Sequence, residues 1–193
     1  MTAGYVSRLL DTLDRQALIE RSRRGEVESV DVQGLLRWWA ESYDVFRANG
    51  TSTFLAPDGT SKALARLATL PTRGEVAVTG SFAAGRVAPV AGAALLLMYC
   101  DDAARTAEAL GLLPADDGAN VALLRPFDPV VWERATTDGG ITYAAPSQVV
   151  VDCLTGTGRM PAEGEALLSW MMENESSWRY SSLAEFHAAR RMA

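Results

Sequence analysis

The first stretch of the chain places its apolar residues at the spacing of an α-helix. They recur at intervals of three and four and so share one helical face, which carries Val6, Leu9, Leu10, Leu13 and Ala17. The opposite face is polar and carries Tyr5, Ser7, Arg8, Asp11, Thr12 and Arg15. Thr2 precedes this run, and its hydroxyl can accept a hydrogen bond from a free N–H group of the first turn. The pattern predicts an amphipathic helix capped by Thr2.

Beyond this helix the spacing of the apolar residues becomes shorter, which indicates two strands joined by a tight turn. Residues 19–23 and 26–30 are predicted to be the strands, with Arg24 and Gly25 as their turn. A polar, arginine-bearing helix followed by an arginine-tipped hairpin is typical of the recognition helix and wing of a winged helix-turn-helix. We expect the helix to enter the major groove and Arg23 and Arg24 to contact phosphates. The alternative is that both elements are ordinary scaffold.

The charge of this region limits the kind of DNA binding that it can support. Residues 1–25 contain five arginines and three acidic residues, whereas the whole chain has a formal net charge of −6. This local excess of positive charge is smaller than the excess on the surface of a strong non-specific DNA-binding protein. We therefore expect DNA contact through one small face. A winged helix also needs a helix and a turn before its recognition helix. We therefore expect that its first helices are missing from this chain.

The rest of the chain alternates short apolar strands with helices. Asp31 is expected to cap a helix over 32–46 with a stripe rich in aromatic residues. Further strands are predicted at 52–56, 76–79, 94–100, 121–124 and 141–144. Further helices are predicted at 61–70, 81–86, after Asp101-Asp102 up to 110, after Asp128-Pro129, and at 146–156, 162–175 and 182–192. Ser182 and Glu185 would form a capping box for the last of them.

This order of elements predicts an α+β or α/β fold. We expect a partial winged helix-turn-helix followed by a small mixed-sheet α/β domain with C-terminal helices. The partial winged helix would occupy residues 1–56, a connecting helix or linker residues 57–73, and the α/β domain residues 74–193.

Composition and cysteine usage point to an ordinary globular chain. With 48% apolar and 22% charged residues over 193 positions, the chain can bury a normal core. We expect no membrane segment, because no apolar run approaches the roughly 20 residues needed to span a bilayer. The N-terminus shows no signal-peptide pattern. Cys100 and Cys153 lie in apolar runs and are predicted to be buried, reduced thiols, so the cytoplasm is the expected compartment.

Two stretches resemble motifs of nucleotide chemistry. Gly80 to Arg86 has the glycine spacing of a phosphate-binding loop, but arginine replaces its lysine and no Mg-binding hydroxyl follows. A strand followed by Gly80-Ser81 also resembles the opening of nucleotidyltransferases, whose metal-binding carboxylates would be Asp101 and Asp102. Neighbours on a strand point to opposite faces, however, which favours a capping role for these aspartates.

The remaining candidate side chains do not assemble a recognised catalytic set. The one histidine, His187, has no nucleophile or ligand nearby in sequence, and we expect it at the surface. Asp152, Glu163 and Glu165 lack the nearby lysine of a metal-dependent nuclease. Aromatic and methionine residues gather near the C-terminus as core or, alternatively, as a partner surface: Trp170, Met171, Met172, Trp178 and Tyr180. We therefore expect no enzyme activity, no cofactor and no metal site.

Several segments together, in their order along the chain, resemble one family. They are GYVSRLLDTLDRQALIERSRRGEVESVD, LLRWWAESYDVFR, VAVTGSFAAGRVAPVAG, ANVALLRPFDPVVWER and YAAPSQVVVDCLTGTGRMPAEGEALL. They resemble the AbiEi-like transcriptional regulators, counterparts of the antitoxins of type IV toxin–antitoxin, or abortive infection, systems. The resemblance covers nearly the whole chain. It implies an N-terminal winged helix that binds operator DNA and a C-terminal α/β domain associated with activity against a nucleotidyltransferase toxin.

The resemblance also implies which residues meet DNA: Thr2, Tyr5, Ser7 and Arg8 on the helix, and Arg23 and Arg24 on the wing. Thr12 and Arg15 lie on the same polar helix face and complete the expected DNA-binding set. The expected function is an autorepressor and toxin neutraliser that binds double-stranded operator DNA, with a homodimer as a further possibility because a dimer would cover an exposed apolar helix face. The alternatives are a protein-interaction module that uses the C-terminal aromatics or Trp38 and Trp39, and a nucleotidyltransferase-like enzyme.

Overall fold

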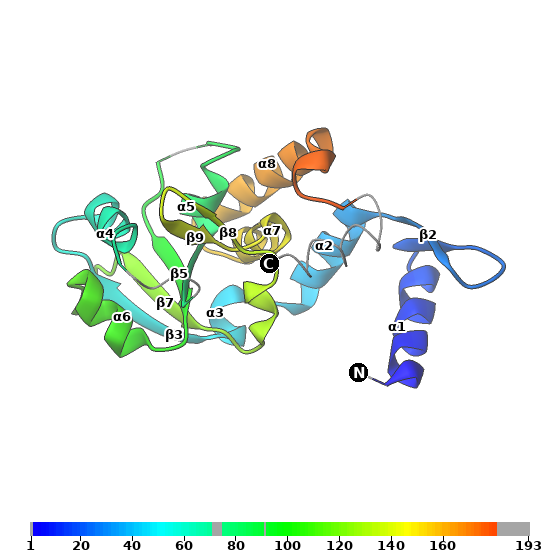
Figure 1. Cartoon of the computed structure of the whole chain (residues 1–193), viewed down its shortest axis with the longest axis horizontal. Coiled ribbons are helices and arrows are strands. Elements are labelled where there is room, and N and C mark those ends of the chain that lie inside the picture. Colours follow the sequence, from blue (N-terminus) through cyan, green and yellow to red (C-terminus); the bar gives the residue numbers. More distant parts are fainter. Residues whose placement is uncertain (1, 71–74, 91, 181–193) are drawn as a thin grey trace. The chain divides into compact units, whose positions relative to one another are not determined.

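A computed structural model describes residues 2–70, 75–90 and 92–180 of the chain (Figure 1). The predicted helix over 182–192, its capping box and His187 lie outside these residues. The chain divides into two compact units, Met1–Tyr43 and Asp44–Ala193, which are described separately below.

The first unit consists of two helices joined by a β-hairpin. Its elements are α1 (Ala3–Arg15), β1 (Ile19–Arg21), β2 (Val27–Val30) and α2 (Val32–Ser42). The hairpin is antiparallel and pairs Ile19 with Val30. Thr2 and Asp31 cap the two helices as predicted, by accepting hydrogen bonds from the N–H groups of Tyr5 and Gly34.

The hairpin strands are shorter than the sequence pattern predicts. The N–H of Ser22 donates to the carbonyl of Glu26 at 2.8 Å, and the N–H of Gly25 donates to the carbonyl of Ser22 at 2.9 Å. Arg23 therefore lies in the turn beside Arg24 rather than in the first strand, and the turn spans five residues.

The end of α1 is fixed by a left-handed alanine. Ala17 has φ +55°, and the N–H of Leu18 reaches back to the carbonyl of Leu13 at 2.9 Å. The N–H of Ala17 donates to the carbonyl of Asp14. This is the Schellman arrangement, in which glycine usually occupies the left-handed position. Ala17, predicted to lie on the apolar face of the helix, is thus outside it.

The second unit is built on a seven-stranded mixed sheet in the order β6-β3-β7-β5-β4-β9-β8. The strands are β3 (Gly50–Leu55), β4 (Val76–Thr79), β5 (Leu96–Cys100), β6 (Leu113–Pro114), β7 (Val121–Arg125), β8 (Thr136–Asp138) and β9 (Ile141–Tyr143). β5 is parallel to β7, β4 is parallel to β9, and the other neighbours are antiparallel. The two outermost strands, β6 and β8, cover only two and three residues.

The second unit also contains α-helices and short 3₁₀ helices. They are α3 (Val45–Ala48), α4 (Thr60–Leu67), α5 (Gly80–Ala84), α6 (Ala103–Leu110), the 3₁₀ helix η1 (Pro129–Trp132), α7 (Pro146–Leu154), α8 (Met160–Glu173) and the 3₁₀ helix η2 (Glu175–Ser177). The helix predicted over 32–46 is divided, because Tyr43 and Asp44 are extended. Asp44 then caps α3 through the N–H groups of Phe46 and Arg47.

The boundary between the units differs from the predicted one at residue 56. β3 pairs with β7 along five residues and with β6 on its other side, so it belongs to the large sheet. Residues 44–56 therefore fold with the second unit. The mixed α+β character of the chain agrees with the prediction.

The core of the second unit lies between the central strands and the helices α5, α7 and α8. All five residues of β5 are buried, and α7 buries six consecutive residues from Gln148 to Cys153. α7 and α8 approach each other closely at Gly164, where an added Cβ would meet the Cβ of Cys153 and the N of Leu154 at 3.0 Å. Close backbone contact thus fixes these two helices against each other.

Candidate functional site

The residues that resemble enzyme motifs have structural partners in the second unit. Ser81 is buried, and its hydroxyl donates a hydrogen bond to the buried carboxylate of Glu163 on α8. Asp102 caps α6 by accepting a hydrogen bond from the N–H of Arg105 at 3.0 Å, and Asp101 is exposed. Over residues 2–70, 75–90 and 92–180, no cluster of three or more His, Cys, Asp and Glu residues could hold a metal ion.

A buried carboxylate connects α7 to the sheet. Asp152 has no exposed surface and accepts hydrogen bonds from the hydroxyl of Thr79 at 2.5 Å and the side-chain amide of Gln148 at 2.8 Å. The hydroxyl of Tyr99 lies 2.9 and 3.0 Å from its two oxygens. The four side chains come from β4, β5 and α7 and form one network. Periodicity in the sequence marks these positions only as buried, so the network was not predicted.

Both cysteines are free and buried, as the sequence predicts. Loss of hydration raises the pKa of Cys153 above its usual value, and the nearby carboxylates of Asp152 and Glu163 raise it further. Loss of hydration also raises the pKa of Cys100, and a hydrogen bond with Thr106 partly offsets this effect. Both thiols therefore stay protonated at neutral pH, which makes them poor nucleophiles.

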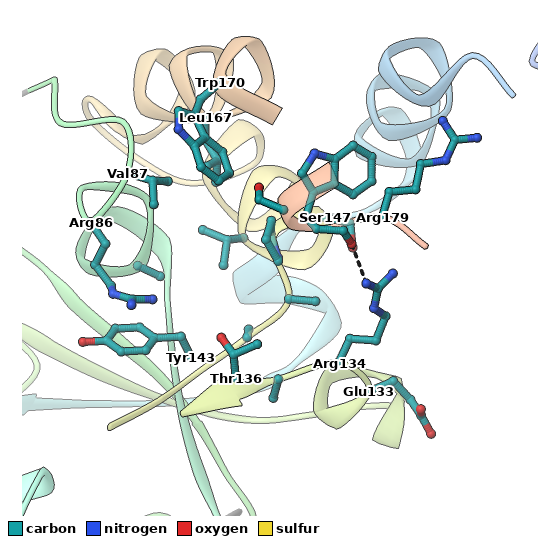
Figure 2. Close-up of a pocket in the computed structure, with 18 of the residues that line it drawn as sticks. Arg86, Val87, Glu133, Arg134, Thr136, Tyr143, Ser147, Leu167, Trp170 and Arg179 are labelled. Atoms are coloured by element: carbon teal, nitrogen blue, oxygen red, sulfur yellow. Dashed lines mark hydrogen bonds between the residues drawn. The ribbon is translucent and has the colours of Figure 1, made fainter. Parts of the chain in front are cut away.

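A pocket of about 730 Å³ lies beside α7 in the second unit (Figure 2). Its walls come from α5, the η1–β9 segment, α7, α8 and residues 176–180. Arg86 lies over the ring of Tyr143, 3.9 Å from its centroid, and forms an ion pair with Asp138 at 2.5 Å. Loss of hydration raises the pKa of Tyr143, while the charge of Arg86 lowers it. Tyr143 is thus a neutral hydrogen-bonding group at neutral pH.

Two stretches that the sequence analysis singled out contribute walls of this pocket, but their sequence does not show that they meet. The Gly80–Arg86 stretch, which resembles a phosphate-binding loop, contributes Ala83 and Arg86. The C-terminal aromatic cluster contributes Trp170, Trp178 and Tyr180, whereas Met171 is fully buried. About 90 residues separate the two stretches, so only the fold brings them together.

The polar face of α1 is at the surface of the first unit. Seven of the eight predicted DNA-contacting residues are exposed, and Thr12 is half-buried. The exposed residues are Thr2, Tyr5, Ser7, Arg8, Arg15, Arg23 and Arg24. The structure therefore leaves the predicted set accessible, from the beginning of α1 to the turn of the hairpin.

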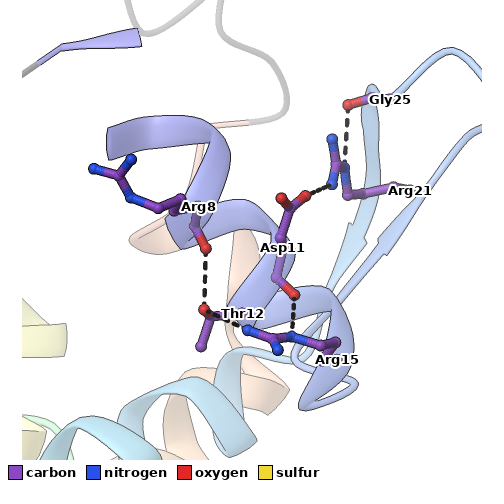
Figure 3. Close-up of polar contacts among 6 residues, drawn as sticks. All are labelled: Arg8, Asp11, Thr12, Arg15, Arg21 and Gly25. Carbon is purple, nitrogen blue, oxygen red and sulfur yellow. Dashed lines mark hydrogen bonds and ion pairs between the residues drawn. The ribbon is translucent and has the colours of Figure 1, made fainter. Parts of the chain in front are cut away.

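Some of these side chains are held by neighbours on the same helix (Figure 3). The guanidinium of Arg15 donates to the carbonyl of Asp11 and to the hydroxyl of Thr12, both at 3.2 Å. The hydroxyl of Thr12 donates in turn to the carbonyl of Arg8 at 3.0 Å. The carboxylate of Asp11 pairs with Arg21 at 2.8 Å, which links α1 to the hairpin. Arg15 and Thr12 thus already have hydrogen-bond partners.

Three other arginines of this unit differ from Arg15 and Arg21 in their side-chain contacts. They are Arg8, Arg23 and Arg24. In the part of the chain that the structure describes, no ion pair or side-chain hydrogen bond engages their guanidinium groups. Arg8 projects from α1 on the side away from Arg21 and Gly25 (Figure 3). Arg8 on α1 and the pair Arg23 and Arg24 in the hairpin turn are therefore exposed at two separate places on this unit.

The apolar face of α1 is largely uncovered. The helix has no buried residue, and Val6 and Leu9 keep 39% and 36% of their surface exposed. The surface of α2 also carries an exposed aromatic residue, since Trp38 is 36% exposed. Its neighbour Trp39 is half-buried and packs its ring against Tyr43, with the centroids 5.7 Å apart.

No helix in the described part of the chain is long and apolar enough to cross a membrane. Comparisons with models of protein families, with curated proteins and with solved structures found no match.

Proposed function

We propose that this chain is a DNA-binding transcriptional regulator of the AbiEi antitoxin type, and that α1 and the β1–β2 turn contact operator DNA. The observation that carries the proposal is the exposure of Arg8, Arg23 and Arg24 without an acidic partner among the described residues. The folded unit has already paired Asp11 with Arg21. The three remaining arginines are thus available to neutralise phosphates or to contact base edges.

The shape of the first unit supports the same conclusion. A single α-helix fits the major groove of B-DNA, and a β-hairpin next to it can reach the backbone. The beginning of α1 presents the exposed side chains of Tyr5, Ser7 and Arg8. The mutual hydrogen bonds of Thr12 and Arg15 hold their side chains close to the helix surface, so we assign them to backbone contacts.

The test is fluorescence anisotropy of the full chain on DNA from immediately upstream of its own gene, over a series of salt concentrations. Arg8→Ala should weaken binding by about 1–3 kcal/mol and reduce the preference for this DNA over a scrambled duplex. Replacing Arg23 and Arg24 together by alanine should weaken binding to both duplexes and reduce the salt slope by about 2, because two phosphate contacts are lost.

The matched control is Arg47→Ala, which removes one exposed arginine from the second unit. The side chain of Arg47 is 90% exposed and only reaches Asp44 at 3.9 Å, so its removal should leave the binding unchanged. The assignment would be refuted if the Arg8 and Arg23/Arg24 variants bound like the parent chain, or if the parent chain did not distinguish the upstream DNA from the scrambled duplex.

A further inference from the structure

We propose that the pocket beside α7 binds a small organic anion with a flat ring, the chemical class of the nucleoside monophosphates. The proposal concerns the second unit alone and does not depend on DNA binding by the first. With a volume of about 730 Å³, the pocket lies within the usual range for small-molecule sites. Three features of its lining indicate the class of ligand.

The first feature is the charge of the lining. The chain has a net charge of −6, yet among the described residues three arginines and a single acidic residue line this pocket. Figure 2 shows Arg86 and Arg134 pointing toward the same space from opposite sides, while Glu133 points away from it. Positive charge in a concave site concentrates the local field and favours an anionic ligand.

The two inward-pointing arginines are held in place by mostly neutral groups. Arg134 donates a hydrogen bond to the carbonyl of Trp178 at 2.5 Å and lies over the ring of Tyr180, 4.3 Å from the centroid. Both contacts leave its positive charge uncompensated. Arg86 shares its charge with Asp138, whose side chain is 70% exposed, so water screens that pair. Fixed guanidinium groups of this kind favour phosphate binding.

The second feature is the beginning of α7, whose partial positive charge adds to that of the arginines. Ala145, Pro146 and Ser147 line the pocket at the start of this helix, and no side chain of the described residues caps it. The free N–H groups of a first helical turn carry partial positive charge. Pro146 has no N–H, so the N–H of Ser147, which lines the pocket, would add to the binding of an anion.

The third feature is an aromatic wall. Trp170 and Leu167 of α8 face the pocket in Figure 2, above Arg86 and Tyr143. The indole N–H of Trp178 donates to the carbonyl of Met171 at 2.6 Å, which fixes that ring as a second flat surface. Indole rings beside guanidinium groups favour a ligand with both a ring to stack and a phosphate to bind.

The test is titration of the full chain with the four nucleoside monophosphates, with binding measured by tryptophan fluorescence and by calorimetry. Inorganic phosphate and adenosine are titrated in parallel. We expect saturable binding of at least one nucleoside monophosphate, and binding at least about tenfold weaker for adenosine and for phosphate, since each lacks one half of the recognition. Absence of saturable binding up to about 5 mM, or equal binding of adenosine, would overturn the proposal.

Two variants locate the binding in the pocket. Arg134→Gln and Arg86→Gln should each weaken nucleotide binding by about tenfold, because a charge-assisted hydrogen bond to phosphate is lost. Arg47→Gln removes the same charge outside the pocket and should bind like the parent chain. Circular dichroism and thermal unfolding establish that each variant folds. If both pocket variants fold and bind as tightly as the parent chain, the nucleotide binds elsewhere and the proposal is wrong.

Discussion

The two units of this chain place their charged groups in opposite ways. In the second unit, the carboxylates of Asp152 and Glu163 are buried and receive hydrogen bonds from hydroxyl and amide groups. In the first unit, α1 has no buried residue, and Arg8 lies exposed without an acidic partner in the described part of the chain. The buried network of the second unit thus satisfies its polar groups internally, whereas α1 leaves charged and apolar surface available to other molecules.

This difference separates structural residues from contact residues. A buried acceptor with several donors stabilises one arrangement of the fold, because its removal leaves every donor unpaired. An exposed arginine contributes little to folding, because water solvates it equally well in the unfolded chain. We therefore expect substitutions in the buried network of the second unit to change stability, and substitutions on α1 or the turn to change binding.

The largest expected effect is at Asp152. Replacing it with alanine removes the acceptor for Thr79, Tyr99 and Gln148 and leaves a cavity, so the free energy of unfolding should fall by about 3–5 kcal/mol. Urea denaturation followed by circular dichroism measures the change. Asp101→Ala is the matched control on an exposed aspartate and should change stability by less than about 0.5 kcal/mol. Equal effects of the two variants would contradict the structural role of the network.

The next effect appears at alkaline pH. Burial raises the pKa of the Cys153 thiol above 9.0, so the folded chain keeps a proton that the unfolded chain loses. The contribution of this thiol to the free energy of unfolding is fully present below pH 9. It falls by about 1.4 kcal/mol per pH unit as the pH rises further. Unfolding free energies measured from pH 8 to about 10.5 should therefore fall less steeply for Cys153→Ala than for the parent chain. Parallel curves would show that the thiol ionises equally in both states.

The smallest expected effect on stability is at Ala17, at the end of α1 in the first unit. Ala17 has φ +55°, a conformation that glycine adopts without strain, so Ala17→Gly should stabilise the end of α1 by about 1 kcal/mol. Gly25→Ala provides the reverse change in the same unit, because Gly25 has φ +82°, and should be destabilising. Hydrogen exchange of the α1 amides reports on this unit and should slow in the first variant. Unchanged exchange rates would show that strain at Ala17 does not limit the stability of α1.

Local signals predicted most of the elements of this fold. Strand β4 and the caps Thr2, Asp31 and Asp128 were predicted at their observed positions, because each depends on neighbouring residues alone. The cap of α6 was predicted as Asp101 or Asp102, and the structure places it at Asp102. The short strands β6 and β8 were missed, since two or three residues show no periodicity. The boundary at residue 56 was misplaced for a related reason. Whether β3 joins the large sheet depends on its partner β7, about 70 residues away.

The candidate sites show the same limit. The polar face of α1 follows from helical spacing, so its exposed residues were predicted individually. The pocket could not be predicted as a unit, because Arg86, Arg134 and Trp170 come from three separate stretches of the chain. The role of Asp152 was also out of reach. Its donors Thr79 and Tyr99 lie on two other elements, and only the packing of α7 against the sheet brings them together.

The shortness of β6 and β8 has a consequence for the behaviour of the chain in concentrated solution. A sheet edge with a long row of free N–H and carbonyl groups is a template on which another molecule can add a strand, and this is a common route to aggregation. Here the seven-stranded sheet ends in strands of two and three residues, and Pro114 in β6 has no N–H to offer. A large sheet with such short edges gives incoming strands little to pair with.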